Sequence, residues 1–495
     1  MNKQLKFLSR AVFAMFLVLF FSVTMIQFVS ADDLRSNPLN QRTIKNGYKV
    51  ERGSIIVEGD PIAFSTPTND TYRYLRGYDP GALYAPVTGH YSRQQGMTGL
   101  EAAMNKELSG NTDAQFFTRI QNTLNGVKPQ GSSIDTSINA KAQQAAYDAM
   151  QEFSFDGAVV AIEPKTGRIL ALVSTPSYDP NLLSMNNDSE IIKNYDTLNA
   201  EEVQPLINRA IAGSLYHPGS VYKLVTAAAA IESGAATPST EFANPASLTL
   251  PQSSSVMRNS DQQTCGSGSK ASLETSIVYS CNIPIAEMAM DMDRNEVPDM
   301  ARAFGFEQEI TIPMEVTPSV APEPIDKAQV ALSSIGQLDV RTTPLQVAMV
   351  SAAIANGGKL MAPQLVDRVI SPDLRVEHEY KPEVMNEPIS KETAQAIAGM
   401  MEKGVSDPTG FARLSAIDGV RVAGKTGTAQ NGIDANGNDL PYTLWYTGFA
   451  PVDDPEVAVA VVIANGGGSS FDFQGGSYDL PTVVGKRVME AVLNG

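Results

Sequence analysis

The sequence HPGSVYKLVTAAAAI, residues 217–231, contains the pattern that decides how the chain is interpreted. A proline–glycine pair before Ser220 predicts a sharp turn, and the alanine-rich apolar run up to Ile231 predicts a buried helix. Ser220 is therefore expected at a helix start, where unpaired backbone N–H groups and the helix dipole favour negative charge. Lys223 shares its helix face one turn later, and an amine whose pKa is lowered by burial can deprotonate a hydroxyl. Taken alone, the same residues also fit a helix-capping serine and a solvated lysine.

Two further patterns follow in the order Ser-x-x-Lys, Ser-x-Asn, Lys-Thr-Gly. They are Ser280-Cys281-Asn282 and Lys425-Thr426-Gly427-Thr428. The lysine at 425 lies in a strand-like segment between glycines, where a substrate backbone can approach closely. Ser280 and Asn282 follow a helical stretch that begins at Ser272, so they also fit polar residues at a helix end.

Each short pattern also occurs elsewhere in the chain, so context has to decide between the copies. The second copies are Ser267–Lys270, Ser137–Asn139, Ser184–Asn186 and Lys165–Gly167. Ser267 lies in a Gly/Ser-rich stretch with no helix to orient it. Lys165 lies at the tip of a predicted hairpin, where a lysine is usually solvated. The copies at Ser220, Ser280 and Lys425 are therefore preferred.

The N-terminus predicts a membrane anchor. Basic residues in segment 1–10 precede an apolar run from Ala11 to about Val29, which suits the length of about 20 residues that a bilayer requires. Positive charge before the run keeps residues 1–10 in the cytoplasm and the remainder outside. The alternative is a cleaved signal peptide ending at Val29-Ser30-Ala31, but the run exceeds the roughly 7–15 residues of a signal core. We expect an anchor over residues 11–31.

Composition excludes several classes of function. The formal net charge of -17 and the pI of about 4.7 argue against nucleic-acid binding. The two cysteines and three scattered histidines form no zinc pattern, so we expect neither a metal nor a cofactor. Cys265 and Cys281 are the only cysteines, and an oxidising outer compartment favours a disulfide between them. Two buried free thiols are the alternative.

The rest of the chain is expected to form two domains. Residues 32–130 are polar and mixed, with a predicted strand at 52–57, a helix up to Leu108 and a linker at 126–133. Residues 131–495 form the larger domain, which has a regular pattern with predicted strands at both ends and helices between them. Its predicted elements are a helix at 140–150 capped by Asn139, a hairpin of 158–162 and 169–173, helices over 220–410, strands at 420–430, 442–449 and 457–463, and a closing helix at 482–493. This order predicts an α+β fold with an antiparallel sheet covered by helices.

Taken together, these motifs resemble the class B penicillin-binding proteins, in particular the penicillin-binding protein A type of actinobacteria. The resemblance covers nearly the whole chain and includes further segments. These are Arg52–Ile55, Gly99–Glu101, Asn208–Ile211, Ser334–Gln337, Thr343–Gln346 and Trp445–Pro451. The chain departs from the usual family pattern at His217, Val221 and Tyr222, which leaves every motif side chain intact.

The resemblance implies a pedestal domain and a transpeptidase domain of the serine β-lactamase fold on the outer side of the cell membrane. It implies that Ser220 attacks the D-Ala-D-Ala bond of a peptidoglycan stem peptide and that Lys223 takes its proton. Ser280 would relay protons and Asn282 would hold the substrate amide. Lys425, Thr426 and Thr428, around Gly427, would bind the terminal carboxylate, and the N–H groups of Ser220 and Thr428 would form the oxyanion hole.

The resemblance also implies β-lactam antibiotics as ligands, and a membrane glycan polymerase and division proteins as partners. Two other functions are compatible with these residues. One is a D,D-carboxypeptidase, a β-lactamase-like hydrolase or a sensor on the same fold. The other is a non-catalytic scaffold for cell-wall synthesis, against which the intact motif residues argue.

Overall fold

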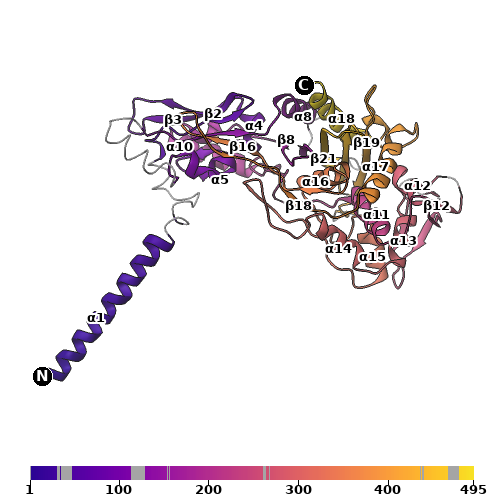
Figure 1. Ribbon diagram of the computed structural model, residues 1–495, viewed down its shortest axis with the longest axis horizontal. Helices are drawn as coiled ribbons and strands as arrows, with labels where there is room; N and C mark the ends of the chain where they lie inside the picture. Colours follow the sequence, from indigo (N-terminus) through magenta and orange to yellow (C-terminus); the bar gives the residue numbers. More distant parts are fainter. Residues whose placement is uncertain are drawn as a thin grey trace.

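The computed structural model describes residues 2–30, 34, 47–112, 129–152, 154, 156–213, 215–259, 263–266, 268–434, 436–437, 440–466 and 479–495. Helix α1 (Asn2–Thr24) continues into a π-helical turn, η1 (Met25–Val29), and lies apart from the folded body in Figure 1. The stretch Lys3–Val29 is long and apolar enough to cross a membrane, and its most apolar window is not buried by the rest of the described chain. Ala31, which ends both the predicted anchor and the alternative cleavage pattern, lies outside the described residues.

Five antiparallel strands form the sheet of the larger domain, in the order β19-β20-β21-β7-β8. Their bounds are β7 Gly157–Ile162, β8 Ile169–Thr175, β19 Ala423–Ala429, β20 Tyr442–Ala450 and β21 Val457–Gly466. The early hairpin and the three late strands join where β21 pairs with β7. The predicted antiparallel sheet is therefore confirmed, with strands from both ends of the domain.

Helices cover both faces of this sheet, as Figure 1 shows. Helices α8 (Ala140–Glu152) and α18 (Leu480–Leu493) pack on one face, where they bury Val159 of β7. Helices α11 (Lys223–Glu232) and α16 (Pro344–Ala355) lie on the other face with Val160. Because alternate side chains of a strand point to opposite faces, a strand buried on both sides needs a continuous apolar run. Asn139 caps α8 as predicted, since its Oδ1 accepts a hydrogen bond of 2.8 Å from the N–H of Ala142.

The smaller domain, here called the pedestal, is built on a six-stranded sheet in the order β17-β16-β6-β1-β2-β3. Its strands are β1 Ile55–Val57, β2 Asp60–Pro67, β3 Tyr74–Tyr78, β6 Ser133–Thr136, β16 Val366–Ile370 and β17 Val376–Glu379. Strand β6 pairs parallel with β1 and antiparallel with β16. In Figure 1 the orange β16 consequently lies beside the indigo strands of the N-terminal segment.

This pairing means that the expected boundary between residues 130 and 131 does not separate the two domains in space. The pedestal sheet takes β6, β16 and β17 from the segment 131–495. These strands are short, and β17 is exposed along its whole length, so their sequences carry no pattern that indicates which sheet they join. Residues 126–128 of the expected linker lie outside the described residues.

Further helices and short strand pairs surround the two sheets. The helices and 3₁₀ turns are α4 Gly81–Thr88, α5 Gly99–Ala103, α6 Asn105–Leu108, α9 Asn181–Ser184, α10 Asp188–Ala200, η2 Gly219–Tyr222, α12 Leu273–Val278, α13 Ile283–Asp291, α14 Glu296–Ala303, α15 Lys327–Ser333, α17 Lys391–Ser406 and η3 Arg413–Ser415. The strands are β4 Tyr91–Ser92, β5 Gly96–Met97, β9 Glu241–Ala243, β10 Ser247–Thr249, β11 Val256–Arg258, β12 Lys270–Ser272, β13 Ile310–Thr311, β14 Glu315–Val316, β15 Leu360–Met361 and β18 Val384–Asn386.

A buried ion cluster holds the pedestal together. Glu101 is fully buried and pairs with Arg52 at 2.5 Å and with Arg76 at 2.6 Å. Burial alone would raise the pKa of Glu101, but the two guanidinium groups outweigh it and hold this pKa below its ordinary value. Arg52 also donates to the carbonyl of Glu101. The helix predicted through Leu108 is divided at Met104 into α5 and α6.

Replacing Glu101 by alanine should destabilise the chain by about 3–5 kcal/mol, because two buried guanidinium groups lose their counter-charge. Urea denaturation of the purified protein measures this change in the free energy of unfolding. The matched control is Glu274→Ala, which removes the partner of the exposed Lys403 and should cost at most about 1 kcal/mol. Equal losses in the two variants would contradict the assignment of Glu101 as a structural centre.

Candidate active site

Ser220 lies in the 3₁₀ turn η2, which leads directly into α11. Gly219 has a φ of 54°, a backbone conformation that residues other than glycine rarely adopt. A Cβ at this position would also come within 2.5 Å of the Thr428 carbonyl oxygen. On the opposite side Gly336 packs against Gly219 and accepts a 3.0 Å hydrogen bond from its N–H. The nucleophile turn is thus fixed between β19 and the loop that contains the Ser334–Gln337 motif.

Strand β19 forms the other wall of the site. It is the edge strand of the five-stranded sheet, and within the described part of the chain no further strand pairs with its outer side. A Cβ at Gly427 would approach Pro218 O and Val221 to 3.1 Å, so the glycine of Lys-Thr-Gly lets η2 lie close to the strand. Trp445, the cross-strand partner of Gly427, donates from its indole nitrogen to His217 O at 2.9 Å.

Lys223 is completely buried beneath this turn. Its Nζ donates to the carbonyl oxygen of Ser280 and to Oδ1 of Asn282, both at 2.7 Å. Burial, together with the charge of Lys425, lowers the pKa of Lys223 well below its ordinary value of 10.5. A neutral amine has two N–H donors and one lone pair. The two observed acceptors use both donors, which leaves the lone pair available to take a proton from a hydroxyl.

Lys425 also contacts Ser280, but at the hydroxyl. Its Nζ lies 2.7 Å from Ser280 Oγ and 2.8 Å from the Thr426 carbonyl oxygen. Burial lowers the pKa of Lys425 to about 7. The backbone of Ser280 has a φ of 57°, which is uncommon for a residue with a side chain. One serine therefore contacts both lysines, Lys223 through its carbonyl and Lys425 through its hydroxyl.

The structure brings all three preferred motifs together, but two contacts differ from the expected roles. Asn282, expected on a substrate amide, binds Lys223 through Oδ1 and donates from Nδ2 to Arg258 O at 2.8 Å, which leaves one amide hydrogen for a substrate. Lys425, expected on a substrate carboxylate, is itself buried against Ser280. Thr426 is also buried, whereas the side chain of Thr428 is exposed at the strand edge.

The second copies of the motifs do not enter this site. Lys165 is exposed at a turn between β7 and β8 and pairs with Asp454. The hydroxyl of Ser137 binds the Ile169 carbonyl, and the hydroxyl of Ser184 binds the Tyr91 carbonyl. Ser267 lies outside the described residues.

Sequence reasoning missed two groups that shape the site. Asn259 accepts hydrogen bonds through its Oδ1 from the N–H groups of Asn282, at 2.9 Å, and Ile283. Arg341 donates to His217 Nδ1 at 2.6 Å. Neither residue belongs to a motif that indicates its role. Among the described residues, no group of three or more His, Cys, Asp or Glu side chains could hold a metal ion.

Comparison with known proteins agrees with this geometry. The model of the penicillin-binding protein transpeptidase domain matches residues 157–490, and that of the penicillin-binding protein A dimerisation domain matches residues 52–134. The chain belongs to the penicillin-binding protein transpeptidase family. Within this family it is 38% identical to the peptidoglycan D,D-transpeptidase PbpA of Mycolicibacterium smegmatis, across 100% of this chain and 99% of the relative. The PbpA of Mycobacterium tuberculosis is also 38% identical, with 100% of both chains covered.

Solved structures show the same architecture. The ceftriaxone acyl-enzyme complex of penicillin-binding protein A from M. tuberculosis has a TM-score of 0.85 and 37% identity, and covers 90% of this chain and 99% of that chain. The corresponding penicillin G complex has a TM-score of 0.83 and covers 90% and 100%. The predicted class B family and α+β transpeptidase fold are thereby confirmed.

The two lysines predict how acylation of this protein by a penicillin depends on pH. Lys223 can accept a proton only when neutral, so the rate should rise with pH through its lowered pKa. Lys425→Met removes the neighbouring positive charge, so the pKa of Lys223 should rise. The acid limb, which is the part of the pH profile where the acylation rate rises with pH, should therefore move to higher pH. Stopped-flow measurement with a fluorescent penicillin gives the rate constants.

The matched control for that experiment is Lys165→Met, which removes the exposed lysine of the second Lys-Thr-Gly. Its acid limb should coincide with that of the unmodified protein. An unchanged limb in Lys425→Met would show that the two amino groups do not influence each other.

Proposed function

We propose that this chain is a membrane-anchored peptidoglycan D,D-transpeptidase in which Ser220 forms an acyl-enzyme with the donor stem peptide. The observation that carries the proposal is the convergence of Lys223 and Lys425 on Ser280 beside the turn that holds Ser220. Its relatives named above are peptidoglycan D,D-transpeptidases, which supports the reaction class. The residues that we assign to the site beside Ser220 are Lys223, Ser280, Asn282, Lys425, Thr426, Gly427 and Thr428.

The neutral amine of Lys223 takes the proton of Ser220 Oγ as this oxygen attacks the carbonyl of the penultimate D-alanine. The resulting oxyanion is stabilised by the N–H of Ser220, at a helix start, and by the N–H of Thr428. Ser280, whose Oγ lies 2.7 Å from Lys425 Nζ, gives its proton to the departing D-alanine amine. The proton that Lys223 took replaces it, so both groups return to their starting state. An acceptor amine of a second stem peptide then attacks the ester, Lys223 takes the proton that this amine loses, and the proton returns to Ser220 Oγ as the serine leaves.

The neutral state of the lysines is central to this chemistry. A protonated Lys223 could not act as a base, and burial lowers its pKa well below the ordinary value, which favours the neutral amine. The same burial excludes water from the protein side of Ser220. Since water competes with the acceptor amine for the ester, a dry site favours cross-linking over hydrolysis.

We place the catalytic domain outside the cell, with α1 as a single membrane span. Residues Lys3, Lys6 and Arg10 lie on one side of the apolar stretch, which supports a cytoplasmic N-terminus. This orientation puts Ser220 in the compartment that contains peptidoglycan. A membrane glycan polymerase and division proteins are the partners we propose for the pedestal, following the family resemblance.

Ser220→Ala should abolish covalent labelling by penicillin and transpeptidation, since loss of a nucleophile lowers the rate by about 10⁶. Peptide mapping of the labelled protein should find the label on Ser220 alone. The matched control, Ser267→Ala, changes the other Ser-x-x-Lys pattern and should label normally. A label on Ser267, or full labelling of Ser220→Ala, would refute the assignment.

The penicilloyl ester on Ser220 should persist for minutes or longer after free drug is removed. The opened ring keeps its leaving amine tethered in the site, where it hinders an acceptor or water, and we assign no residue as a base for a deacylating water. Gel filtration followed by timed mass spectrometry measures the decay. Rapid recovery of the free enzyme with many turnovers of hydrolysed drug would instead indicate a β-lactamase-like hydrolase.

A further inference from the structure

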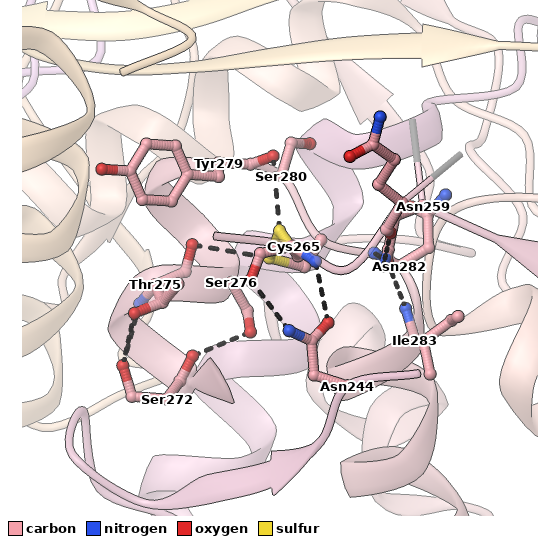
Figure 2. Close-up of a disulfide and its surroundings, with 12 residues drawn as sticks. Asn244, Asn259, Cys265, Ser272, Thr275, Ser276, Tyr279, Ser280, Asn282 and Ile283 are labelled. Carbon is pink, nitrogen blue, oxygen red and sulfur yellow. Dashed lines mark hydrogen bonds between the residues drawn. A yellow bond between two sulfur atoms is a disulfide. The ribbon is translucent and has the colours of Figure 1, made fainter. Parts of the chain in front are cut away.

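The motifs that meet at the active site are held in different ways. A disulfide joins Cys265 to Cys281, the middle residue of the Ser280–Asn282 motif, and Figure 2 shows this bridge next to Ser280. The chain has no further cysteine. The turn that contains Ser220 therefore depends on hydrogen bonds and packing alone, and these contacts decide where the N–H of Ser220 points.

The direction of the Ser220 N–H is set by the peptide group that it shares with the Gly219 carbonyl. This peptide bond is trans, so the carbonyl and the N–H point in opposite directions. Gly336 lies against the carbonyl so closely that a Cβ at position 336 would come within 2.3 Å of its oxygen. The N–H of Ser220 consequently points away from Gly336. At a helix start such an N–H has no acceptor within the turn and is available to an oxyanion.

The loop that supplies Gly336, here the loop 336–341, has a backbone that needs support. Gly336 has a φ of 73°, and Leu338, two residues later, has a φ of 62°. A residue with a Cβ rarely adopts this conformation unless its surroundings hold it there. The side chain of Leu338 is only half-buried, so hydrogen bonds have to supply most of that support.

These hydrogen bonds come from Arg341. Its Nη1 donates to the carbonyl oxygens of Leu338, at 2.7 Å, and Val340, at 3.0 Å. The same nitrogen lies 2.6 Å from Nδ1 of His217. Because a guanidinium group has no acceptor, the imidazole accepts this bond and is neutral. Burial and the nearby charge of Arg341 lower the pKa of His217, which favours this neutral form.

Backbone pairing brings Arg341 next to the segment that precedes the nucleophile. Tyr216 and Thr342 exchange two backbone hydrogen bonds, of 3.1 and 2.8 Å, which places His217 beside Arg341. The guanidinium group then closes a ring that runs from His217 through the nucleophile turn and back along the loop 336–341. Within this ring the N–H of Gly219 donates to the carbonyl of the loop's first residue at 3.0 Å.

We propose that Arg341 is a positioning residue for catalysis, which holds the loop 336–341 against the nucleophile turn and so directs the N–H of Ser220 into the oxyanion hole. The inference rests on the proposed function of Ser220. His217, one of the residues at which the chain departs from the usual family pattern, is the acceptor through which Arg341 reaches the turn. Arg341 acts on the step in which the oxyanion forms and leaves the preceding binding step unchanged.

The test compares Arg341→Met with the unmodified full chain in detergent. Stopped-flow acylation by a fluorescent penicillin separates the dissociation constant of the first complex from the rate constant of acylation. The variant should acylate about ten- to a hundredfold more slowly, the cost expected of a small displacement of a catalytic group. The dissociation constant should stay unchanged, because the oxyanion forms only after the complex.

A boronic acid with the side chain of penicillin G supplies an independent readout. Ser220 Oγ adds to the boron and the serine proton passes to Lys223, which gives a tetrahedral, negatively charged adduct with one oxygen where the oxyanion forms. In Arg341→Met the affinity for this probe should fall by the same factor as the acylation rate constant, since both report interactions made in the transition state.

Position 217 offers a matched pair of variants. His217→Phe keeps a ring but loses the acceptor, so it should also slow acylation. Combined with Arg341→Met it should be no slower than Arg341→Met alone, because both changes break the same contact. His217→Asn places an acceptor oxygen near the position of Nδ1 and should recover most of the rate that His217→Phe loses.

A stability control comes from α14. Arg302→Met removes an arginine whose guanidinium pairs with Asp299, Glu307 and Glu323 at the surface. This variant should acylate at the unmodified rate. Circular dichroism of each variant measures the fraction of folded protein to which its rate is normalised.

The outcomes distinguish this inference from the function on which it rests. An unchanged acylation rate in Arg341→Met, or a slower rate with full affinity for the boronic acid, would refute the positioning role. Equal rates in His217→Phe and His217→Asn, or a loss that disappears on normalisation to folded protein, would also contradict it. Unmodified protein that carries no label on Ser220 would instead refute the proposed function.

Discussion

Lys223 and Lys425 approach one residue, Ser280, from two sides, the first at its carbonyl and the second at its hydroxyl. Burying two amino groups this close together is unfavourable while both are charged, and the unfavourable energy is relieved when they lose protons. The rest of the larger domain maintains this constraint. Helices α11 and α16 on one face of the sheet exclude water, and the edge strand β19 supplies Lys425 in a fixed register. The glycines at 219, 336 and 427 allow the close packing.

The pedestal also buries charged groups, but there they have a structural role. Glu101 is buried between two arginines, and the charges are retained because they are paired. The difference between the two clusters is chemical. Opposite charges hold a permanent ion pair, whereas like charges favour neutral amines that can accept a proton. Burial thus yields a rigid support in one domain and a base in the other.

The parts of this structure that depend on nearby residues could be predicted from the sequence. The spacing of Ser220 and Lys223, the cap at Asn139 and the apolar strands of the central sheet are all local features. The pairing of β16 with β6 could not be predicted, because more than two hundred residues separate them and neither strand has a distinctive pattern. The contact of Lys425 with Ser280, and the clamp of Asn259 on Asn282, likewise appear only after folding. The family resemblance named Lys425, Ser280 and Asn282 without showing which groups they bind, and it did not name Asn259.

The most direct test of the central claim is an NMR titration of the lysine side-chain nitrogens in the detergent-solubilised chain, with Lys223→Met and Lys425→Met used to assign the two signals. The account predicts that Lys425 titrates at about pH 7 and that the pKa of Lys223 lies well below 10.5. Titration of Lys223 near its ordinary value would contradict the account, because the amine beside Ser220 would then be charged and could not act as the base.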